Sequence, residues 1–193
     1  MSKAKVLFRQ LGASNHTDKE RELNDFYATD PRAVELLLKK EKFAHDIWEP
    51  ACGKGHICRV LNMRGYNVRA TDLIDRGYGL GGVDFLAQKE PWQGDIITNP
   101  PYKYAGDFAW HALELIPEGN KVALFLRVQF LEGKERRKMF EQQPPEFVYV
   151  SSGRMGCARN GEFNKTDASG AMCFAWFVWR KGFKGDPRVK WIN

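Results

Sequence analysis

The sequence predicts an α/β protein built on a doubly wound, mostly parallel sheet, and three observations support this fold class. Short apolar runs of strand length alternate with longer segments whose apolar residues recur at helical spacing. A glycine-containing turn follows the first long predicted strand. Polar side chains suited to ligand binding stand where strands end, at Glu49, Asp72, Asp84 and Asn99. Because such sheets bind ligands at the carboxyl ends of their strands, one shared site is expected there.

The individual elements follow from local patterns. In chain order we expect a helix at 31–40, a strand ending at 48, a helix at 57–63, strands at 67–72 and 95–98, a helix at 104–116, a strand at 121–126, a helix near 133–140 and closing strands at 147–150 and 172–179. Pro31 suits a first helical turn, Gly65 ends the second helix and Pro117 stops the third.

Length and composition indicate one domain. A chain of 193 residues can bury one full core, which we assign to residues 25–193, whereas the polar residues 1–24 are expected to form a mobile arm. The sequence has neither an apolar run of membrane-spanning length nor a signal-peptide core. Its four cysteines lack metal-ligand spacing, so we expect reduced thiols, no metal site and a cytoplasmic protein.

The turn after the first long strand predicts a cofactor site. Gly53 and Gly55 allow close approach of the backbone to a ligand, and Asp72 follows Gly53 by 19 positions, near the spacing at which doubly wound folds bind a ribose. The dinucleotide fingerprint fails because Cys58 replaces its third glycine, and the phosphate-loop pattern fails after Lys54. A nucleoside-bearing cofactor without a pyrophosphate is therefore expected, and S-adenosylmethionine fits that description.

The segment from Asn99 to Tyr102 predicts a pocket for a planar group that carries an exocyclic NH2. Asn99 supplies a neutral carbonyl oxygen, the pair Pro100 and Pro101 fixes the backbone and leaves carbonyls that can point outward, and Tyr102 offers an aromatic face. An ordinary Pro-Pro turn explains these four residues equally well when they are taken alone.

The paired motifs together resemble a known family. Glu49-Pro50-Ala51-Cys52-Gly53-Lys54-Gly55 followed by Asn99-Pro100-Pro101-Tyr102 is similar to the S-adenosylmethionine-dependent DNA N6-adenine methyltransferases, above all their small phage and prophage members. Asp25–Pro31, Gly82–Leu86 and Phe174–Lys181 resemble further motifs of the family, so the likeness extends from about residue 25 to the end. It implies a Rossmann-like class I methyltransferase fold with an antiparallel strand in a C-terminal hairpin.

The resemblance also implies a set of cofactor-binding residues. They are Tyr27, Thr29, Glu49, Ala51, Gly53, Gly55, Asp72, Asp84, Phe85 and Asn99. Glu49 would contact the methionine end of the cofactor, and Asp72 the ribose hydroxyls. Asp84 would contact the adenine amine and Phe85 the adenine ring, although Asp84 could instead cap a loop and Phe85 could pack in the core. Asp30 stands where the family often has proline.

Asn99, Pro100, Pro101 and Tyr102 would form the catalytic set. Oxygen acceptors from Asn99 and Pro100 would each take one N–H of the target amine and direct its lone pair toward the sulfonium methyl. A paired adenine would have to flip out of the duplex and stack on Tyr102. No strong general base is required, because the methylated nitrogen can lose its proton to water.

The charge distribution favours a nucleic-acid partner. Residues 1–119 carry 16 Lys and Arg against 17 Asp and Glu, whereas residues 120–193 carry 14 against 7. A basic surface beside a base pocket suits a polyphosphate. We expect nucleic-acid contacts from Arg127, Arg154, Arg159 and Lys165, while residues 132–138 fit a solvated helix face.

Several functional alternatives remain open at this stage. The same pocket could hold an adenine of RNA, the N4 amine of cytosine or a glutamine amide, and a non-catalytic nucleic-acid-binding protein of this fold is also possible. The chain lacks a separate target-recognition region, which leaves only the arm and the loop at about 153–170 for that role. We therefore expect weak sequence preference. The oligomeric state and the biological role (modification, anti-restriction or regulation) are not fixed by the sequence.

Overall fold

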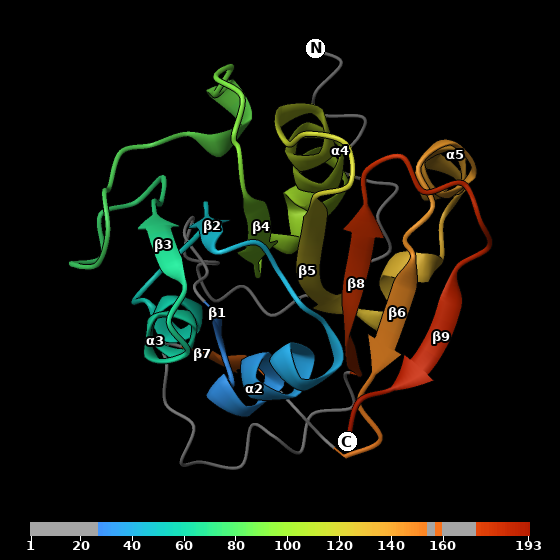
Figure 1. Cartoon of the computed structure of the whole chain (residues 1–193), viewed down its shortest axis with the longest axis horizontal. Helices are drawn as coiled ribbons and strands as arrows, with labels where there is room; N and C mark the ends of the chain where they lie inside the picture. Colours follow the sequence, from blue (N-terminus) through green and yellow to red (C-terminus); the bar gives the residue numbers. More distant parts are fainter. Residues whose placement is uncertain (1–26, 154–156, 160–172) are drawn as a thin grey trace, which may run out of the picture.

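The core of the protein is a seven-stranded sheet with helices on both faces (Figure 1). The structure, a computed structural model, describes residues 27–153, 157–159 and 173–193. The strands are β1 (Tyr27–Thr29), β2 (Asp46–Glu49), β3 (Asn67–Ala70), β4 (Asp95–Thr98), β5 (Lys121–Arg127), β6 (Phe147–Val150), β7 (Cys157–Arg159), β8 (Phe174–Arg180) and β9 (Arg188–Trp191). The α-helices are α2 (Pro31–Lys40), α3 (His56–Met63), α4 (Ala105–Leu115) and α5 (Lys134–Gln142). Short 3-10 helices occur at Phe85–Ala87, Tyr102–Tyr104 and Val128–Leu131.

The topology confirms the predicted doubly wound, mostly parallel sheet. The strand order is β3-β2-β4-β5-β8-β6-β9, and β8 is antiparallel to both of its neighbours, as expected for the C-terminal hairpin. The chain runs outward from β2 to β3 and then returns to β4 on the other side of β2. Such a reversal of strand order opens a crevice at the carboxyl ends of the two strands, and it is here that β2 and β4 end.

Two apolar layers hold the helices against the sheet. Along β5, Val122 and Leu124 face the layer that contains α4, whereas Ala123 and Phe125 face the layer that contains α2 and α3. This alternation is the two-residue period of a strand that is buried on both faces. Figure 1 accordingly shows α2 and α3 on one side of the sheet and α4 and α5 on the other. Trp176 extends the second layer, and its indole N–H donates to the Ala33 carbonyl.

The helix boundaries follow their capping residues. The Asp30 side chain accepts a hydrogen bond from the Arg32 backbone N–H, and Pro31 occupies the first turn of α2. Lys39 and Lys40 lie in its last turn, where positive charge is favourable. Gly55, with a φ of 79°, precedes α3. Because this φ is left-handed, glycine is the residue that adopts it at low cost.

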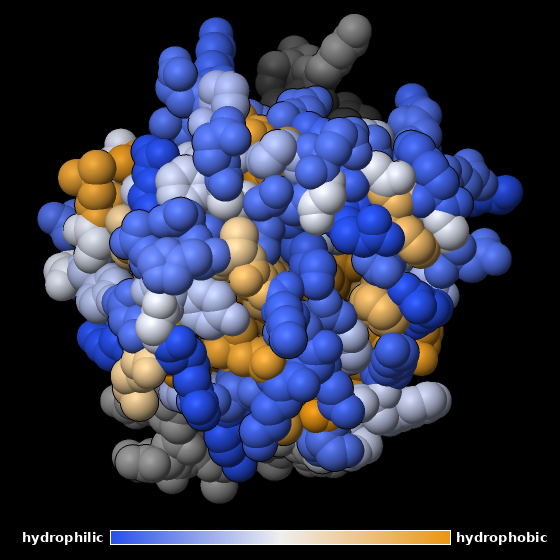
Figure 2. All heavy atoms as spheres, in the orientation of Figure 1, coloured by the Kyte–Doolittle hydropathy of each residue, from blue (hydrophilic) through white to orange (hydrophobic). Residues whose placement is uncertain are grey.

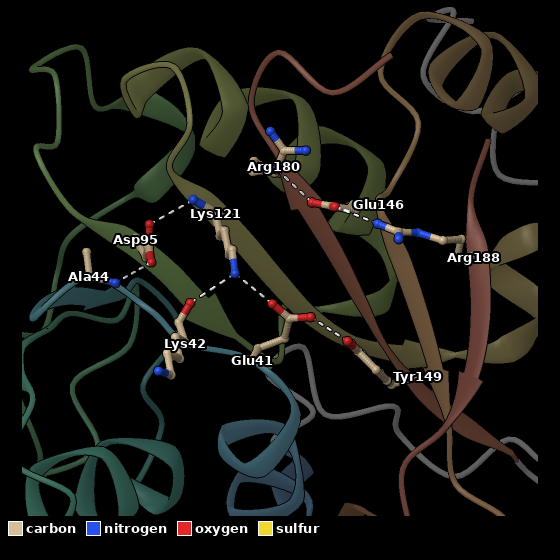
Figure 3. Close-up of polar contacts among 9 residues, drawn as sticks. All are labelled: Glu41, Lys42, Ala44, Asp95, Lys121, Glu146, Tyr149, Arg180 and Arg188. Carbon is tan, nitrogen blue, oxygen red and sulfur yellow. Dashed lines mark hydrogen bonds and ion pairs between the residues drawn. The ribbon is translucent and has the colours of Figure 1, made fainter. Parts of the chain in front are cut away.

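Buried polar contacts join the amino ends of β4 and β5 to the segment after α2 (Figure 3). The Asp95 carboxylate accepts hydrogen bonds from the backbone N–H groups of Ala44 and Lys121, at 2.6 and 2.7 Å. The Lys121 ammonium donates to the Glu41 carboxylate at 2.6 Å, and the Tyr149 hydroxyl donates to the same carboxylate. We term this set of residues the amino-end network.

Three elements differ from the sequence expectation. The strand predicted to reach Asp72 ends at Ala70, although Thr71 still forms an isolated bridge to Leu80. Strand β9 was not predicted, because its residues are all exposed and show no apolar alternation. The antiparallel pair β1–β7 was not predicted either, since its two strands lie far apart in the sequence. Residues 1–24, the predicted arm, and most of the loop at 153–170 lie outside the described residues.

The visible surface is dominated by hydrophilic side chains, with apolar ones in separate small groups (Figure 2). The large apolar side chains that are most exposed are Met63, Leu73, Leu80, Val189 and Trp191. Among the described residues, no helix has the length and apolar character needed to cross a membrane.

Candidate active site

The site is built where β2 and β4 end side by side. The two strands are parallel neighbours, with Trp48 opposite Ile96, so the polar residues that follow them lie at one edge of the sheet. Asn99 comes directly after β4, Pro100 is buried, and Tyr102 opens a 3-10 helix. Sequence reasoning placed these residues together at the strand ends, and the structure does the same.

The Asn99 side chain is held in one orientation by its amide nitrogen. Nδ2 donates to the Tyr27 carbonyl oxygen at 3.0 Å and contacts the Cys157 sulfur at 3.4 Å. Because the nitrogen is engaged in this way, Oδ1 is turned away from β1 and keeps its lone pairs for another donor. The strand pair β1–β7 therefore sets the direction of the one side-chain acceptor in this motif.

Tyr102 lies among aromatic and cationic neighbours. Its hydroxyl donates to the Cys157 sulfur at 3.4 Å, and its ring centroid lies 5.9 Å from that of Tyr27 and 6.2 Å from that of Phe174. The guanidinium carbon of Arg127 lies 4.7 Å from the ring centroid. Burial raises the pKa of Tyr102, so its phenol stays neutral throughout the physiological range.

Glu49 is a buried acid without a partner. Its side chain is 1% exposed, and among the described residues neither carboxylate oxygen makes a hydrogen bond. Burial raises the pKa of Glu49 well above its ordinary value. The Thr98 hydroxyl and the backbone N–H groups of Ala51 and Asn99 act in the opposite direction, but none reaches the carboxylate with normal hydrogen-bond geometry. Buried polar atoms normally have partners, so this carboxylate fits a site that a cationic or hydrogen-bonding ligand completes.

The glycine turn is tied to Asp72. The Asp72 carboxylate accepts from the Gly53 backbone N–H at 2.8 Å and from the Ile74 backbone N–H at 2.9 Å. Gly53 adopts a φ of 53°, which explains why glycine stands there. The ring of Tyr78 fills the space beside Gly55, where an added Cβ would lie 2.5 Å from it. The turn thus approaches both an acid and an aromatic ring at close range.

Asp84 and Phe85 occupy places that the sequence left open. The Asp84 side chain caps the 3-10 helix Phe85–Ala87 by accepting from the Leu86 backbone N–H at 3.0 Å. Phe85 is 2% exposed, and its ring packs against Trp48 and Phe108 with centroid distances of 5.2 and 4.8 Å. The alternative readings, a cap and a core residue, therefore describe their contacts here. Their cofactor roles stay predictions.

The remaining predicted site residues have different standing. Thr29 is buried in β1, and its hydroxyl has no hydrogen-bond partner among the described residues. Ala51 packs against the core layer of α4. Arg127 lies beside Tyr102, whereas Arg154 and Lys165 fall outside the described residues. Arg159 ends β7, and its side chain is also outside the described part of the chain.

Two residues at the site were not predicted as functional. Cys157 contacts both Asn99 and Tyr102, and burial raises the pKa of its thiol to about 11, so it remains protonated at neutral pH. Tyr78 covers the glycine turn. No local motif marks either residue, because both contacts join segments that are distant in sequence. In the described ranges no three His, Cys, Asp or Glu side chains gather closely enough to hold a metal ion.

Comparison with known proteins identifies the fold. No protein-family model matches the chain, and no curated protein matches it in sequence. The modification subunit of a candidate type I restriction enzyme from Vibrio vulnificus YJ016 superposes with a TM-score of 0.60 at 10% identity, covering 90% of this chain and 48% of that one. A candidate RNA methyltransferase from Pyrococcus horikoshii gives 0.54 at 14% identity, covering 93% and 97%.

An S-adenosylmethionine-dependent O-methyltransferase from Thermotoga maritima gives a TM-score of 0.55 at 12% identity, covering 83% of this chain and 69% of that one. Likenesses at such low identity establish the architecture and leave the substrate open. The chain has a class I methyltransferase-like fold.

Proposed function

We propose that this protein transfers a methyl group from S-adenosylmethionine to the exocyclic N6 amine of adenine in DNA. The observation that carries the proposal is the Asn99 side chain at the end of β4, whose amide nitrogen is engaged by Tyr27 and whose oxygen is left to accept. It lies at the switch point of a methyltransferase-like fold, beside an unpartnered buried acid. A site for an amine and a site for a cationic cofactor would therefore adjoin.

Asn99 would act on the amine itself. In the ground state the amine lone pair is delocalised into the purine ring, which makes the nitrogen a weak nucleophile. If Asn99 Oδ1 and the Pro100 carbonyl each accept one N–H, a tetrahedral nitrogen with an outward lone pair is favoured. As the new N–C bond forms and the C–S bond breaks, positive charge develops on nitrogen, and these oxygens are already directed at it. Water then takes the proton.

The residues around Glu49 fit the cofactor, which would supply an electrophilic methyl group on a positively charged sulfur. Glu49 would offset positive charge at its methionine end, and Gly53 and Gly55 would let the backbone approach it. Asp72 accepts one hydrogen bond on each oxygen and retains lone pairs for ribose hydroxyls. Tyr27 and Thr29 would complete this side through β1.

A nucleic-acid substrate is supported by charge and by likeness. The excess of Lys and Arg lies in residues 120–193, and Arg127 from this segment lies beside Tyr102. RNA adenine is the second candidate, because the Pyrococcus neighbour, an RNA methyltransferase candidate, is covered almost completely. The modification subunit among the neighbours favours DNA.

The test is transfer of radiolabelled methyl groups to unmethylated double-stranded DNA, single-stranded DNA and RNA in parallel, followed by nucleoside analysis. The critical variant is Asn99→Ala, and Asn67→Ala, at the exposed start of β3, is the matched control. N6-methyladenine in DNA that disappears only in Asn99→Ala would establish the proposal. Label in RNA alone would transfer it to the second candidate, and a strict target motif in random-sequence oligonucleotides would refute weak sequence preference.

A further inference from the structure

The predicted stacking surface for the target base is already covered in the free protein. Arg127 ends β5, the strand next to β4, and its guanidinium carbon lies 4.7 Å from the Tyr102 ring centroid. A cation at this distance over an aromatic ring is attracted by the ring electrons. A base that stacks on the same surface would have to occupy the volume of the guanidinium.

The other neighbours of Tyr102 are less able to leave. The rings of Tyr27 and Phe174 are tilted by 39° and 40° to it, and both belong to hydrogen-bonded strands, β1 and β8. The hydroxyl of Tyr102 is held at the Cys157 sulfur. Arg127, by contrast, reaches the ring through a long side chain whose rotamers can change without moving the sheet.

Arg127 also has unused hydrogen-bonding capacity. Among the described residues it forms no ion pair, and its buried Nε has no hydrogen-bond acceptor. A cation–π contact contributes about 0.5–2 kcal/mol, whereas a guanidinium can make two parallel charge-assisted hydrogen bonds to a phosphate. A phosphate within reach would therefore attract the guanidinium away from the ring.

We propose that Arg127 shields Tyr102 in the free protein and moves to a backbone phosphate of the entering nucleotide, which uncovers the ring for the base. The inference rests on the proposed function in assuming that a base stacks on Tyr102. It adds that the substrate must bring a phosphate beside that base. A nucleotide within a polynucleotide meets this requirement, whereas a free nucleoside or a glutamine amide in a protein does not.

The first experiment measures affinity for a single-stranded oligothymidylate that contains one deoxyadenosine. The phosphate on either side of that nucleotide is replaced in turn by an uncharged methylphosphonate. We expect one replacement to weaken binding to the wild-type protein by about tenfold. Arg127→Met should bind the two oligonucleotides equally, at the weaker level, and Arg127→Lys should restore part of the difference.

The matched control is Arg188→Met. Arg188 also lies over an aromatic ring, 4.1 Å from the Phe147 centroid, but it belongs to β9 at the far edge of the sheet. Its substitution removes the same charge, and the variant should discriminate the methylphosphonate as the wild-type protein does. If Arg127→Met also discriminates fully, or if the wild-type protein does not bind the oligonucleotide, the inference is overturned.

The second experiment tests shielding by comparing methyl transfer to the oligonucleotide and to free deoxyadenosine. Loss of Arg127 should narrow the preference for the oligonucleotide by at least tenfold, because the ring is then uncovered without a phosphate. An unchanged preference in Arg127→Met, with transfer intact, would overturn the inference and leave the proposed function standing. Absence of transfer to any nucleic acid by the wild-type protein would instead refute the proposed function, while the phosphate comparison would still report on Arg127.

Discussion

The two ends of the central strands treat buried acids in opposite ways. At the amino ends, Asp95 accepts from two backbone N–H groups and from the Asn120 side chain, and Glu41 is paired with Lys121 (Figure 3). At the carboxyl ends, Glu49 is equally buried, yet its carboxylate has no hydrogen-bond partner among the described residues. The distance along β4 that separates these environments is only four residues.

This difference separates residues that hold the fold from residues that await a ligand. A buried carboxylate with donors stabilises the native state through those donors, whereas one without them imposes a desolvation cost. The cost at Glu49 persists only if another role maintains the residue, and binding of a cationic cofactor would be such a role. Substitutions at the two ends should therefore have opposite consequences for stability and activity.

The largest expected effect is on catalysis at the carboxyl end. Asn99→Ala removes the acceptor for the target amine, and we expect kcat to fall on the order of 10³-fold. Thermal unfolding should change little, since the lost side-chain contacts are only those to Tyr27 and Cys157. Methyl-transfer rates and calorimetric scans of the same preparation measure both. A large loss of stability would mean that Asn99 holds the fold.

The amino end should show the reverse. Asp95→Ala leaves the Ala44 and Lys121 backbone N–H groups without their acceptor, which should reduce the free energy of unfolding by about 3 kcal/mol. Urea unfolding measures the change, with exposed Glu90→Ala as the control. The kcat of the protein that remains folded should equal that of the wild type, and a selective loss of kcat would contradict the separation of the two ends.

Glu49→Gln should stabilise the free protein. Burial raises the pKa of Glu49, so ionising it disfavours the folded state, and this penalty grows as the pH rises above the unfolded-state pKa. The variant should therefore unfold like the wild type near pH 4 and exceed it by about 1–3 kcal/mol near pH 8. Urea titrations across this range would show it. An advantage that does not grow with pH would indicate that the carboxylate is not strained.

The smallest expected effect concerns Cys157, which contacts two motif residues. Cys157→Ala should lower kcat about tenfold, because it loosens Asn99 and Tyr102 without removing them. Cys157→Ser should retain most of the rate, and Cys173→Ala, at an exposed thiol, should match the wild type. Steady-state kinetics with all three variants would decide, and equal rates for Cys157→Ala and the wild type would remove any positioning role.

Much of the fold could be predicted because its signals are local. The sequence indicates α2 and β6 with the observed boundaries, since Asp30 and Pro31 mark a helix start and residues 147–150 form a short apolar run. Strand β9 escaped prediction because it is held by pairing with β6 and not by burial of its own side chains. Long-range pairing decides such a strand.

The site was predictable as a location but less so as a set of contacts. Motif spacing brought Glu49, Asp72 and Asn99 to neighbouring strand ends. It could not show that Cys157 would lie against Asn99, or that Arg127 would cover Tyr102, because both contacts depend on how distant segments pack. For Phe85, residue type suits a core and a cofactor wall equally, and its rings of contact in the structure lie within the core.

The most direct test of the central claim is calorimetric titration of S-adenosylmethionine into the wild-type protein and Glu49→Gln near neutral pH, in two buffers of different ionisation enthalpy. We expect one cofactor per chain, with proton release on binding to the wild type because positive charge beside Glu49 favours its ionised form. In Glu49→Gln, binding should weaken and proton release should disappear. Equal affinity and equal proton release in both proteins would contradict the assignment of this end of the sheet as the cofactor site.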